Sequence, residues 1–392
     1  MGSPLSDAHP APPGHGSPRP PEPPLIPLGA EELAWLDRAV LLGRRGWGRA
    51  HPNPLVGCVL VRDGRVLAEG WHGEFAGPHA EVDALERAWE DPGGSTAYVS
   101  LEPCRHHGKT PACTDTLLAA GVERVVFGVA DPHAEAGGGG RALRAAGVRV
   151  EGPVWPAAAG RRENPAFFHG VASTRPYVAV KLALSLDGGI AAAPGERTEL
   201  SGREARRASH RLRAGFDAVL VGAVTARVDD PRLTVRAGGV EPRTPPVRIV
   251  LDSQGAVRGD SALLREGEGP VIVFVRDDLN PPARTRLERA GARVEPVPPA
   301  ARGLDLGAVL AAAAGAGIRS ILCEGGGKLA SSFLAEGLAG RLYLLHAPMV
   351  LGAAAVPAFP GPFPEGSWLG WRPAFTPERL GGDVLTVYER EC

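Results

Sequence analysis

Residues 100–113 read SLEPCRHHGKTPAC and bring two cysteines, two adjacent histidines and a lysine into one short stretch of a chain with five cysteines in 392 residues. Thiolate sulfur and imidazole nitrogen are donors that zinc prefers. Upstream, the segment HAE supplies His79 and Glu81. Zinc held by His79, Cys104 and Cys113 would keep its fourth tetrahedral position open for water, as catalytic zinc does. The Glu81 carboxylate could then carry a proton from that water to a leaving amine.

Each part of this pattern also has an ordinary structural explanation. A Glu at a helix start commonly complements the helix dipole, and two cysteines in a loop are commonly structural or unpaired. A closed, non-catalytic zinc module would need a fourth protein ligand, which only His106 or His107 offers nearby. Taken together, these features match in kind the signature of zinc nucleobase deaminases, in which H-x-E is followed by a strand, then by P-C and a second Cys. In this chain, however, eight residues and not two separate the cysteines.

The elements around the pattern are expected to bring these side chains to one rim. His79 opens an expected helix, Cys104 follows an expected strand, and Cys113 opens the next helix, where the helix dipole lowers a thiol pKa. The spacing predicts a helix from Glu31, a hairpin over 55–72 turning at Asp63-Gly64, helices over 79–89 and 114–121, strands over 96–102 and 122–130, and a helix-strand pair ending near Val150.

Composition narrows the class of protein. The chain has 43 Lys and Arg against 44 Asp and Glu, a net charge of −1. It therefore lacks the excess of positive charge that favours binding to nucleic acid or an anionic membrane. No apolar run is long enough to span a bilayer, no signal-peptide pattern opens the chain, and the odd, scattered cysteines do not form a secreted disulfide framework. We therefore expect a cytoplasmic protein without nucleic-acid or membrane partners. We also expect a homo-oligomer, although composition does not bear on it.

The chain divides into a head and two unlike α/β halves. Residues 1–28 contain ten prolines, so we expect a disordered extension over 1–30. A first domain is expected over 31–152, a linker over 153–176 and a second α/β domain over 177–392. After PYVAVKLALSLDG, the second half alternates expected strands over 217–223, 247–252, 271–275, 320–326, 341–350 and 383–389 with expected helices over 202–214, 283–290, 304–314 and 327–337.

Two segments of the second half could bind phosphate or charge. VGAVTARVDDPRLTVR follows an expected strand and holds a Thr, a pair of Asp and several Arg. CEGGGKLASSF sets a Gly-rich turn between a buried strand and a helix, where backbone N–H groups can approach a phosphate, although such a turn is often only a tight connection. It is not the G-x-G-x-x-G of a Rossmann domain, so the ordinary dinucleotide fingerprint is absent.

The first half resembles a known family. HPNPLVGCVLV, GWHGEFAGPHAEVDAL, AYVSLEPCRHHGKTPAC and AAGVERVVFGVADP are similar to the deaminase half of the bifunctional RibD-type deaminase-reductases of riboflavin biosynthesis, whose longer inter-cysteine loop carries HHG[KR]TP. The resemblance implies a cytidine-deaminase-like three-layer α/β fold, zinc on His79, Cys104 and Cys113, and Glu81 as the proton shuttle. It also implies substrate contacts from Asn53, His72, Lys109 and Asp131.

The second half resembles the reductase half of the same family over about 174–350, through KLALSLDGGIA, VLDSQG and the two segments above. This implies a fold similar to dihydrofolate reductase and NADPH as cofactor. By position, the implied cofactor contacts are Ala183, Thr225, Asp229, Ser253, Gly326, Gly327, Lys328, Leu329, Ala330, Ser331 and Ser332. The implied substrate contacts are Lys181, Arg213, Leu233, Arg236 and Glu324. Relatives place Ser and Trp in a G-E-S-x-W pattern where this chain has Arg197 and Glu199, so those two contacts are not carried over.

The resemblance implies two reactions in sequence on a phosphorylated pyrimidine. The first is zinc-dependent hydrolytic deamination of 2,5-diamino-6-ribosylamino-4(3H)-pyrimidinone 5′-phosphate. The second is NADPH-dependent reduction of the ribosyl group to ribityl, giving 5-amino-6-(5-phospho-D-ribitylamino)uracil. The alternative is a nucleic-acid or nucleoside zinc deaminase with an inactive accessory domain, which should show a basic binding surface and would leave the second domain unexplained.

Overall fold

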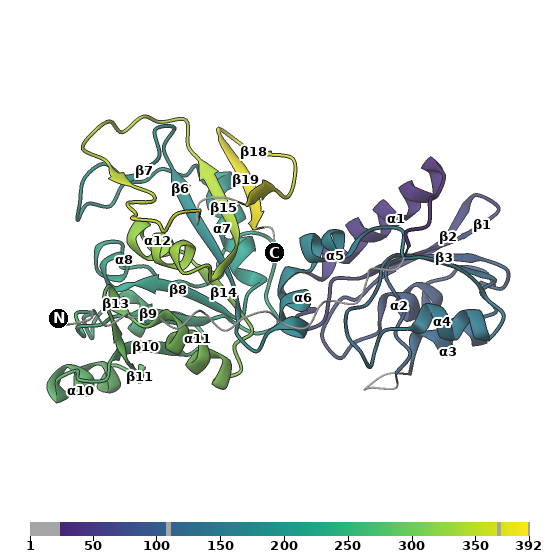
Figure 1. Ribbon diagram of the computed structural model, residues 1–392, viewed down its shortest axis with the longest axis horizontal. Coiled ribbons are helices and arrows are strands. Elements are labelled where there is room, and N and C mark those ends of the chain that lie inside the picture. The colour runs from purple at the N-terminus through teal and green to yellow at the C-terminus, as the bar shows by residue number, and fades with distance from the viewer. Residues whose placement is uncertain (1–23, 107–110, 367–369, 391–392) are drawn as a thin grey trace, which may run out of the picture.

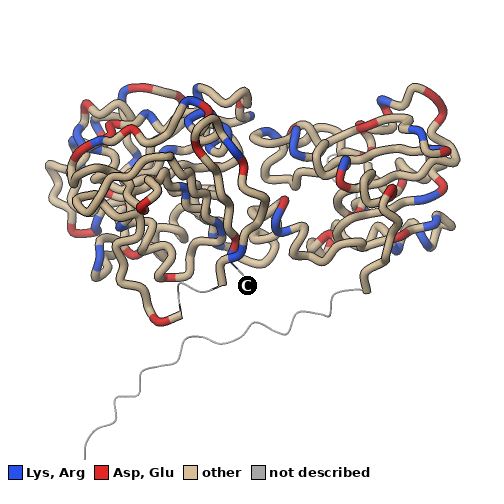
Figure 2. Tube along the Cα trace, turned by 90° about the horizontal axis from the view of Figure 1, so that it is seen from above, with Lys and Arg blue, Asp and Glu red and all other residues tan. Residues whose placement is uncertain are grey.

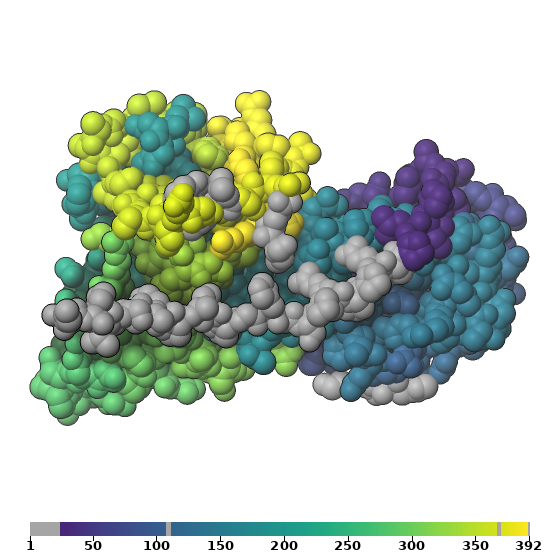
Figure 3. All heavy atoms as spheres, viewed as in Figure 1, coloured from purple at the N-terminus to yellow at the C-terminus, as the bar shows by residue number. Residues whose placement is uncertain are grey.

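Two α/β domains joined by a pair of short helices make up the chain in the computed structural model, which describes residues 24–106, 111–366 and 370–390. Figure 1 shows the domains side by side with the joining helices between them, and Figure 3 shows two rounded bodies with a waist. Charged residues of both signs are interspersed over both domains (Figure 2). None of the helices described is both long and apolar enough to cross a membrane.

The N-terminal domain is a three-layer sandwich around a five-stranded sheet of order β2-β1-β3-β4-β5. The strand β1 pairs antiparallel with β2 and β3, whereas β3, β4 and β5 run parallel. Leu36 and Leu42 of α1 pack on one face of the sheet, and Ala84 and Leu117 of α2 and α3 pack on the other. The elements are α1 (Ala30–Gly43), a 3-10 turn (Arg44–Gly46), β1 (Gly57–Arg62), β2 (Arg65–Trp71), α2 (Ala80–Glu86), β3 (Thr96–Leu101), α3 (Cys113–Ala119), β4 (Arg124–Val129), α4 (Gly139–Ala145) and β5 (Arg149–Glu151).

The joining helices α5 (Ala157–Glu163) and α6 (Pro165–Ala172) are tied to both domains. Asn164, between them, accepts a hydrogen bond from the backbone of Leu55 at 2.6 Å and donates one back at 3.2 Å. On the other side, the buried Arg341 guanidinium donates to the carbonyl of Arg162 at 2.7 Å. The segment expected as a linker is therefore hydrogen-bonded on both sides. Residues 24–29 of the expected disordered head are described, and Ile26 N donates to Pro153 O at 3.2 Å; residues 1–23 lie outside the described part.

The C-terminal domain is built on a ten-stranded sheet of order β11-β10-β9-β8-β14-β6-β15-β19-β17, with β18 also paired to β19. The strands from β11 to β15 run parallel, and β19, β17 and β18 add an antiparallel edge. Val309 of α11 and Phe333 of α12 pack on one face, while Ala205 of α7 and Leu287 of α10 pack on the other.

The strands of the C-terminal domain are β6 (Tyr177–Leu184), β7 (Gly189–Ala191), β8 (Ala218–Gly222), β9 (Val247–Leu251), β10 (Val271–Arg276), β11 (Arg293–Val297), β12 (Pro299–Ala300), β13 (Gly303–Leu304), β14 (Ser320–Cys323), β15 (Ala339–His346), β16 (Val356–Pro357), β17 (Trp371–Pro373), β18 (Glu378–Leu380) and β19 (Asp383–Arg390). Its helices are α7 (Arg203–Ala214), α8 (Ala223–Val228), α9 (Ala262–Arg265), α10 (Pro281–Arg289), α11 (Leu306–Gly315) and α12 (Gly327–Ala335).

Several elements differ from the sequence expectation; β11 and α9 form where no element was expected, and the strand expected over 320–326 ends at Cys323. The helix expected over 79–89 ends at Glu86, and the chain then turns toward the Pro92-Gly94 region. The strand expected over 341–350 ends at His346, two residues before Pro348, which has no N–H to donate to a ladder. The short helix α8 forms where no helix was expected, because among its six residues only Ala226 is buried and no apolar period marks it.

Candidate active sites

Three side chains at the ends of elements form a metal-ligand cluster in the N-terminal domain. His79 is the N-cap of α2, Cys113 is the first residue of α3, and Cys104 lies in the loop after β3. His79 Nδ1 lies 3.2 Å from Cys113 Sγ and 3.5 Å from Cys104 Sγ, and the two sulfur atoms are 3.4 Å apart. The rim expected from the sequence is thus formed by these three residues.

This donor set fits zinc. Zinc–sulfur bonds of about 2.3 Å and zinc–nitrogen bonds of about 2.0 Å in a tetrahedron require donor separations of about 3.5 to 3.8 Å, a few tenths of an ångström from those observed. The pKa of Cys104 is lowered, first through its hydrogen bond with the Cys113 thiol and then, against the effect of burial, through His79. Cys104 is therefore a ready thiolate ligand.

No fourth ligand closes the cluster within the described residues. In the described part of the chain, the group consists of His79, Cys104 and Cys113, and His106 is exposed and outside it. His107 lies outside the described residues. A set of three protein ligands is the arrangement of catalytic zinc, which keeps one position for water or substrate.

Glu81 lies beside this cluster as the second residue of α2. It is only 3% exposed, and burial raises its pKa while His79 opposes the rise. Glu81, His79 and Cys104 line one cavity of about 400 Å³. A carboxyl group held next to a three-ligand metal site, inside a cavity, can exchange protons with whatever occupies the open position.

The residues implied as substrate contacts line the same cavity where the structure describes them. Asn53 Nδ2 lies 3.1 Å from His72 Nε2, and His72 Nδ1 lies 2.8 Å from the carbonyl of Pro78. Because a carbonyl can only accept, His72 donates from Nδ1 and accepts from Asn53 at Nε2, so the Asn53 carbonyl oxygen is left for a ligand. Burial lowers the pKa of His72, in keeping with a neutral ring.

Asp131 also lines the cavity, and Lys109 lies outside the described residues. Burial raises the pKa of Asp131 to about 6, although His133 N donates to its carboxylate at 2.8 Å. Sequence reasoning missed two aromatic members of the lining, Phe75 and Phe167. Phe75 lies three residues after His72, but Phe167 comes from α6, outside the expected domain, and no local pattern marks it.

A second charged cluster lies in the C-terminal domain, where Glu324 follows β14 directly. Arg213 near the end of α7 donates to both Glu324 carboxylate oxygens, at 2.6 and 3.1 Å, and Lys181 Nζ on β6 lies 3.7 Å away. Burial would raise the pKa of Glu324, but Arg213 and Lys181 outweigh it and hold the pKa at about 2. Three of the implied substrate contacts therefore form one buried cluster, in which two cations surround one carboxylate.

The Gly-rich turn opens α12 at the edge of the sheet. Gly326 is the N-cap, and its N–H donates to Thr225 Oγ1 of α8 at 3.1 Å. A Cβ on Gly327 would lie 2.5 Å from the carbonyl oxygen of Pro357, so that position needs glycine. Lys328 is exposed in the first turn, and Ser331 Oγ is buried without a hydrogen-bond partner among the described residues. A helix N-terminus with an adjacent exposed cation fits a dinucleotide phosphate.

The other implied cofactor contacts lie at the same edge. Ala183, Thr225 and Ser253 lie at or just beyond the carboxyl ends of β6, β8 and β9, where ligands bind open parallel sheets. Asp229 caps the end of α8, and burial raises its pKa while Arg197 opposes the rise. Gly327, Leu329, Ala330 and Ser332 belong to α12 itself.

Two implied substrate contacts are placed differently from the charged cluster. The side chain of Leu233 is 2% exposed and packs in the hydrophobic core with Val219 and Val250, so only its backbone could meet a ligand. Arg236 is exposed, two residues after Thr234, whose carbonyl accepts from Arg213 at 3.0 Å. Both contacts stay predictions.

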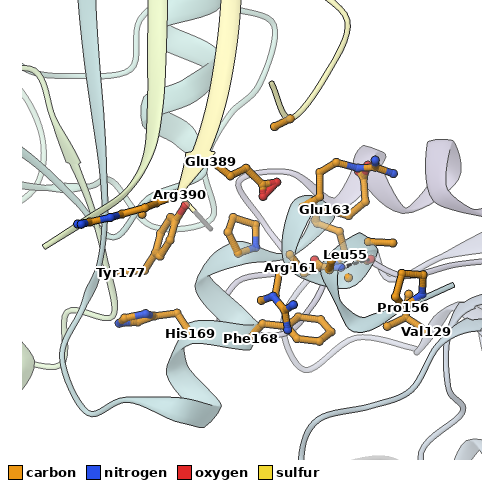
Figure 4. Close-up of a pocket in the computed structure, with 18 of the residues that line it drawn as sticks. Leu55, Val129, Pro156, Arg161, Glu163, Phe168, His169, Tyr177, Glu389 and Arg390 are labelled. Carbon is orange, nitrogen blue, oxygen red and sulfur yellow. Dashed lines mark hydrogen bonds and ion pairs between the residues drawn. The ribbon is translucent and has the colours of Figure 1, made fainter. Parts of the chain in front are cut away.

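A larger cavity of about 1320 Å³ lies between the domains and is lined by none of the predicted site residues. Figure 4 shows Arg161 and Glu163 of α5 on one side of it and Tyr177 and Arg390 of the C-terminal domain on the other. Glu163 is already paired with Arg44 through two contacts of 2.9 Å. This cavity marks the domain junction, separate from both clusters.

The chain matches two family models, the cytidine and deoxycytidylate deaminase zinc-binding region over residues 30–129 and the RibD C-terminal domain over residues 176–374. It is similar to the riboflavin biosynthesis protein RibD of Actinobacillus pleuropneumoniae (38% identical; 82% of this chain and 85% of the relative) and of Escherichia coli (37%; 82% and 89%).

Solved structures agree. The chain is similar to Acinetobacter baumannii RibD, with a TM-score of 0.76 and 32% identity over 92% of this chain and 99% of the other. The same values describe its similarity to a diaminohydroxyphosphoribosylaminopyrimidine deaminase/5-amino-6-(5-phosphoribosylamino)uracil reductase from Thermotoga maritima.

Proposed function

The chain belongs to the RibD family of riboflavin biosynthesis, and from this premise we propose that it deaminates and then reduces the pyrimidine phosphate expected from its sequence. The family, the fold class, the pairing of a zinc deaminase with a reductase, and the zinc and NADPH cofactors are confirmed. The substrate and the role of each residue are our proposal.

In the N-terminal domain we assign zinc to His79, Cys104 and Cys113. Bound there, zinc would act as a Lewis acid that lowers the pKa of a water ligand. Glu81 would accept a proton from the attacking water and pass it to the amine at C2 of the pyrimidinone, so that ammonia leaves and oxygen replaces nitrogen. The carbonyl oxygen of Asn53, left free by the Asn53–His72 hydrogen bond, would accept a hydrogen bond from the substrate.

In the C-terminal domain we assign the cofactor to the start of α12, with Thr225 and Lys328 beside its phosphates. Bound NADPH would supply hydride for C1′ of the opened ribosyl group. Glu324 holds Arg213 and Lys181 in fixed positions through the contacts above, so the pocket presents oriented donors. The exposed guanidinium of Arg236 is free to meet the substrate phosphate, whose oxygens match its fork.

One observation carries the proposal: an open three-ligand zinc cluster with Glu81 beside it, in one cavity, in the same chain as a reductase domain. The described cysteines Cys58, Cys104, Cys113 and Cys323 are free thiols, which supports a reducing compartment such as the cytosol. The homo-oligomer stays a prediction.

The test is to supply the purified chain with 2,5-diamino-6-ribosylamino-4(3H)-pyrimidinone 5′-phosphate, with and without NADPH, and to follow ammonia and NADPH separately. We expect ammonia in both cases and NADPH oxidation only after deamination. The variant Glu81→Gln should keep zinc and still oxidise NADPH when given the deaminated intermediate, while ammonia release nearly stops. Wild-type protein that releases ammonia but never oxidises NADPH, even with that intermediate, would refute the reductase half of the proposal.

A further inference from the structure

Residues 46–53, here called the docking segment, connect α1 to the deaminase cavity and lie against the reductase domain. The segment is internally hydrogen-bonded, since Ala50 N donates to Gly46 O at 2.9 Å and Asn53 N donates to Ala50 O at 3.0 Å. Its last residue, Asn53, lines the deaminase cavity. A short, internally bonded segment of this kind passes a displacement at one end to the other.

Trp47 anchors the first end of the docking segment on the reductase domain. Its indole Nε1 donates to the carbonyl of Arg211 on α7 at 2.7 Å, and its ring meets Phe216 edge to face at 6.4 Å. The fit is close, because a Cβ on Gly215 would lie 2.1 Å from the Trp47 ring. The next residue, Gly48, accepts from Arg243 N at 3.0 Å through its carbonyl.

His51 anchors the segment a second time, two residues before Asn53. Its Nε2 lies 2.9 and 3.0 Å from the two carboxylate oxygens of Asp217, at the start of β8. Asp217 is itself fixed, because one of its oxygens accepts from the backbone N–H groups of Arg319 and Ser320 at 2.8 and 3.0 Å. His51 is therefore attached to the parallel sheet of the reductase domain.

The docking segment also supports the walls of the deaminase cavity. A Cβ on Gly46 would lie 2.3 Å from the carbonyl oxygen of His72, so the segment packs directly on the backbone of Asn53's hydrogen-bond partner. Phe75, which lines the cavity, donates its N–H to Arg49 O at 3.0 Å, and Arg243 of the reductase domain stacks over the Phe75 ring at 5.0 Å. Two walls of the cavity thus depend on the docking segment.

We propose that Trp47 and His51 are positioning residues for deamination: by anchoring the docking segment to the reductase domain, they hold Asn53 and Phe75 in the geometry that binds the deaminase substrate. This inference rests on the proposed function. Neither residue touches zinc or Glu81, so weakening the anchors should affect substrate binding and leave the chemical step and the reductase site unchanged.

The test uses full-length His51→Ala, in which Asp217 keeps its two backbone donors and is not left unsatisfied. We expect KM for ammonia release to rise about tenfold, because the variant loses the binding free energy of roughly one hydrogen bond that fixed the docking segment. The kcat should stay within about twofold of wild type. Zinc content and the reductase kinetics on the deaminated intermediate should not change. His51→Gln, whose amide can still donate to Asp217, should restore most of the affinity.

Trp47→Phe gives an independent test, because it keeps a ring against Phe216 but loses the bond to Arg211 O; KM should again rise. The matched control is Arg65→Ala, which removes an exposed cation–π contact with Trp89 at the far hairpin turn and should leave KM unchanged. A KM within twofold of wild type for both variants would overturn the inference, and so would a parallel loss of reductase activity. Wild-type protein that releases no ammonia would instead contradict the proposed function.

Discussion

Glu324→Gln should show how much the buried charged cluster of the reductase domain stabilises that domain. The substitution keeps the shape of the side chain but removes its charge. Arg213 then loses a partner that accepts from it at 2.6 and 3.1 Å, and Lys181 loses its counterion at 3.7 Å. Two cations would be left in a site where all three side chains are 13% exposed or less.

The magnitude follows from the pKa of Glu324, which falls from an ordinary 4.5 to about 2. A difference of about 2.5 pKa units corresponds to about 3 kcal/mol of the free energy of unfolding, in line with the roughly 3–5 kcal/mol lost when one partner of a buried ion pair is removed. Because the folded pKa is depressed, this stability is fully present above about pH 4.5 and is lost as the pH falls toward 2. The difference in the free energy of unfolding between wild type and Glu324→Gln should therefore narrow to about half by pH 3.

The assay is hydrogen exchange of peptides from β8 and β14 in increasing urea, because it follows the reductase domain even where acid has removed zinc from the other domain. Glu266→Gln is the control, since Glu266 pairs with Arg232 at 2.5 Å but is 42% exposed, and its loss should cost less than about 1 kcal/mol. A loss below 1 kcal/mol for Glu324→Gln, or a loss that does not change with pH, would refute the reasoning.

Two further predictions concern zinc and the domain junction. Cys113→Ser should remove most of the roughly one zinc per chain that we expect in wild-type protein, as elemental analysis would show; fresh, unchelated wild-type protein without zinc would contradict the site. Gly215→Ala should lower the free energy of unfolding by about 1–3 kcal/mol in urea titrations, because the new methyl group would meet the Trp47 ring. The control Gly315→Ala, with open space around it in α11, should be neutral or slightly stabilising. Equal effects of the two substitutions would contradict the close fit of Trp47 against Gly215.

The deaminase chemistry could be predicted from the sequence because its residues sit at the ends of elements. Turn and capping signals fix where a helix begins, so His79 and Cys113 could be placed at helix starts and Cys104 after a strand, before any fold was known. The alternation of helices and strands predicted a layered α/β domain, and the resemblance implied its three layers. The reductase residues had no comparable local signal; their assignment came from resemblance alone.

The docking segment could not be predicted, because its contacts join residues more than 160 positions apart. Trp47 to Arg211 and His51 to Asp217 are separated by 164 and 166 residues, and neither hydrophobic period nor turn chemistry carries information over that distance. Leu233 shows a limit of prediction by resemblance. Resemblance gave its position as a contact, but not that its side chain would be buried in the core.

Arg197 and Glu199, where this chain departs from its relatives, give the last prediction. Glu199 is 68% exposed and pairs with Arg197 at 3.7 Å and Arg206 at 3.6 Å, so its charge faces solvent and cations. Such an exposed pair contributes at most about 1 kcal/mol, and Glu199→Trp would lose little while adding an aromatic face for the cofactor.

Burial raises the pKa of Asp229, one of the implied cofactor contacts, and Arg197 opposes that rise. Once Glu199 no longer pairs with Arg197, the charge of Arg197 should favour binding of a polyanionic ligand. We therefore expect Glu199→Trp to leave KM for NADPH unchanged or to lower it by up to about fivefold, since an aromatic contact adds about 1 kcal/mol. Glu199→Gln separates the two causes, because it removes the charge without adding a ring. A KM for NADPH that rises more than threefold in Glu199→Trp, with the fold intact, would mean that Glu199 itself serves the reductase site.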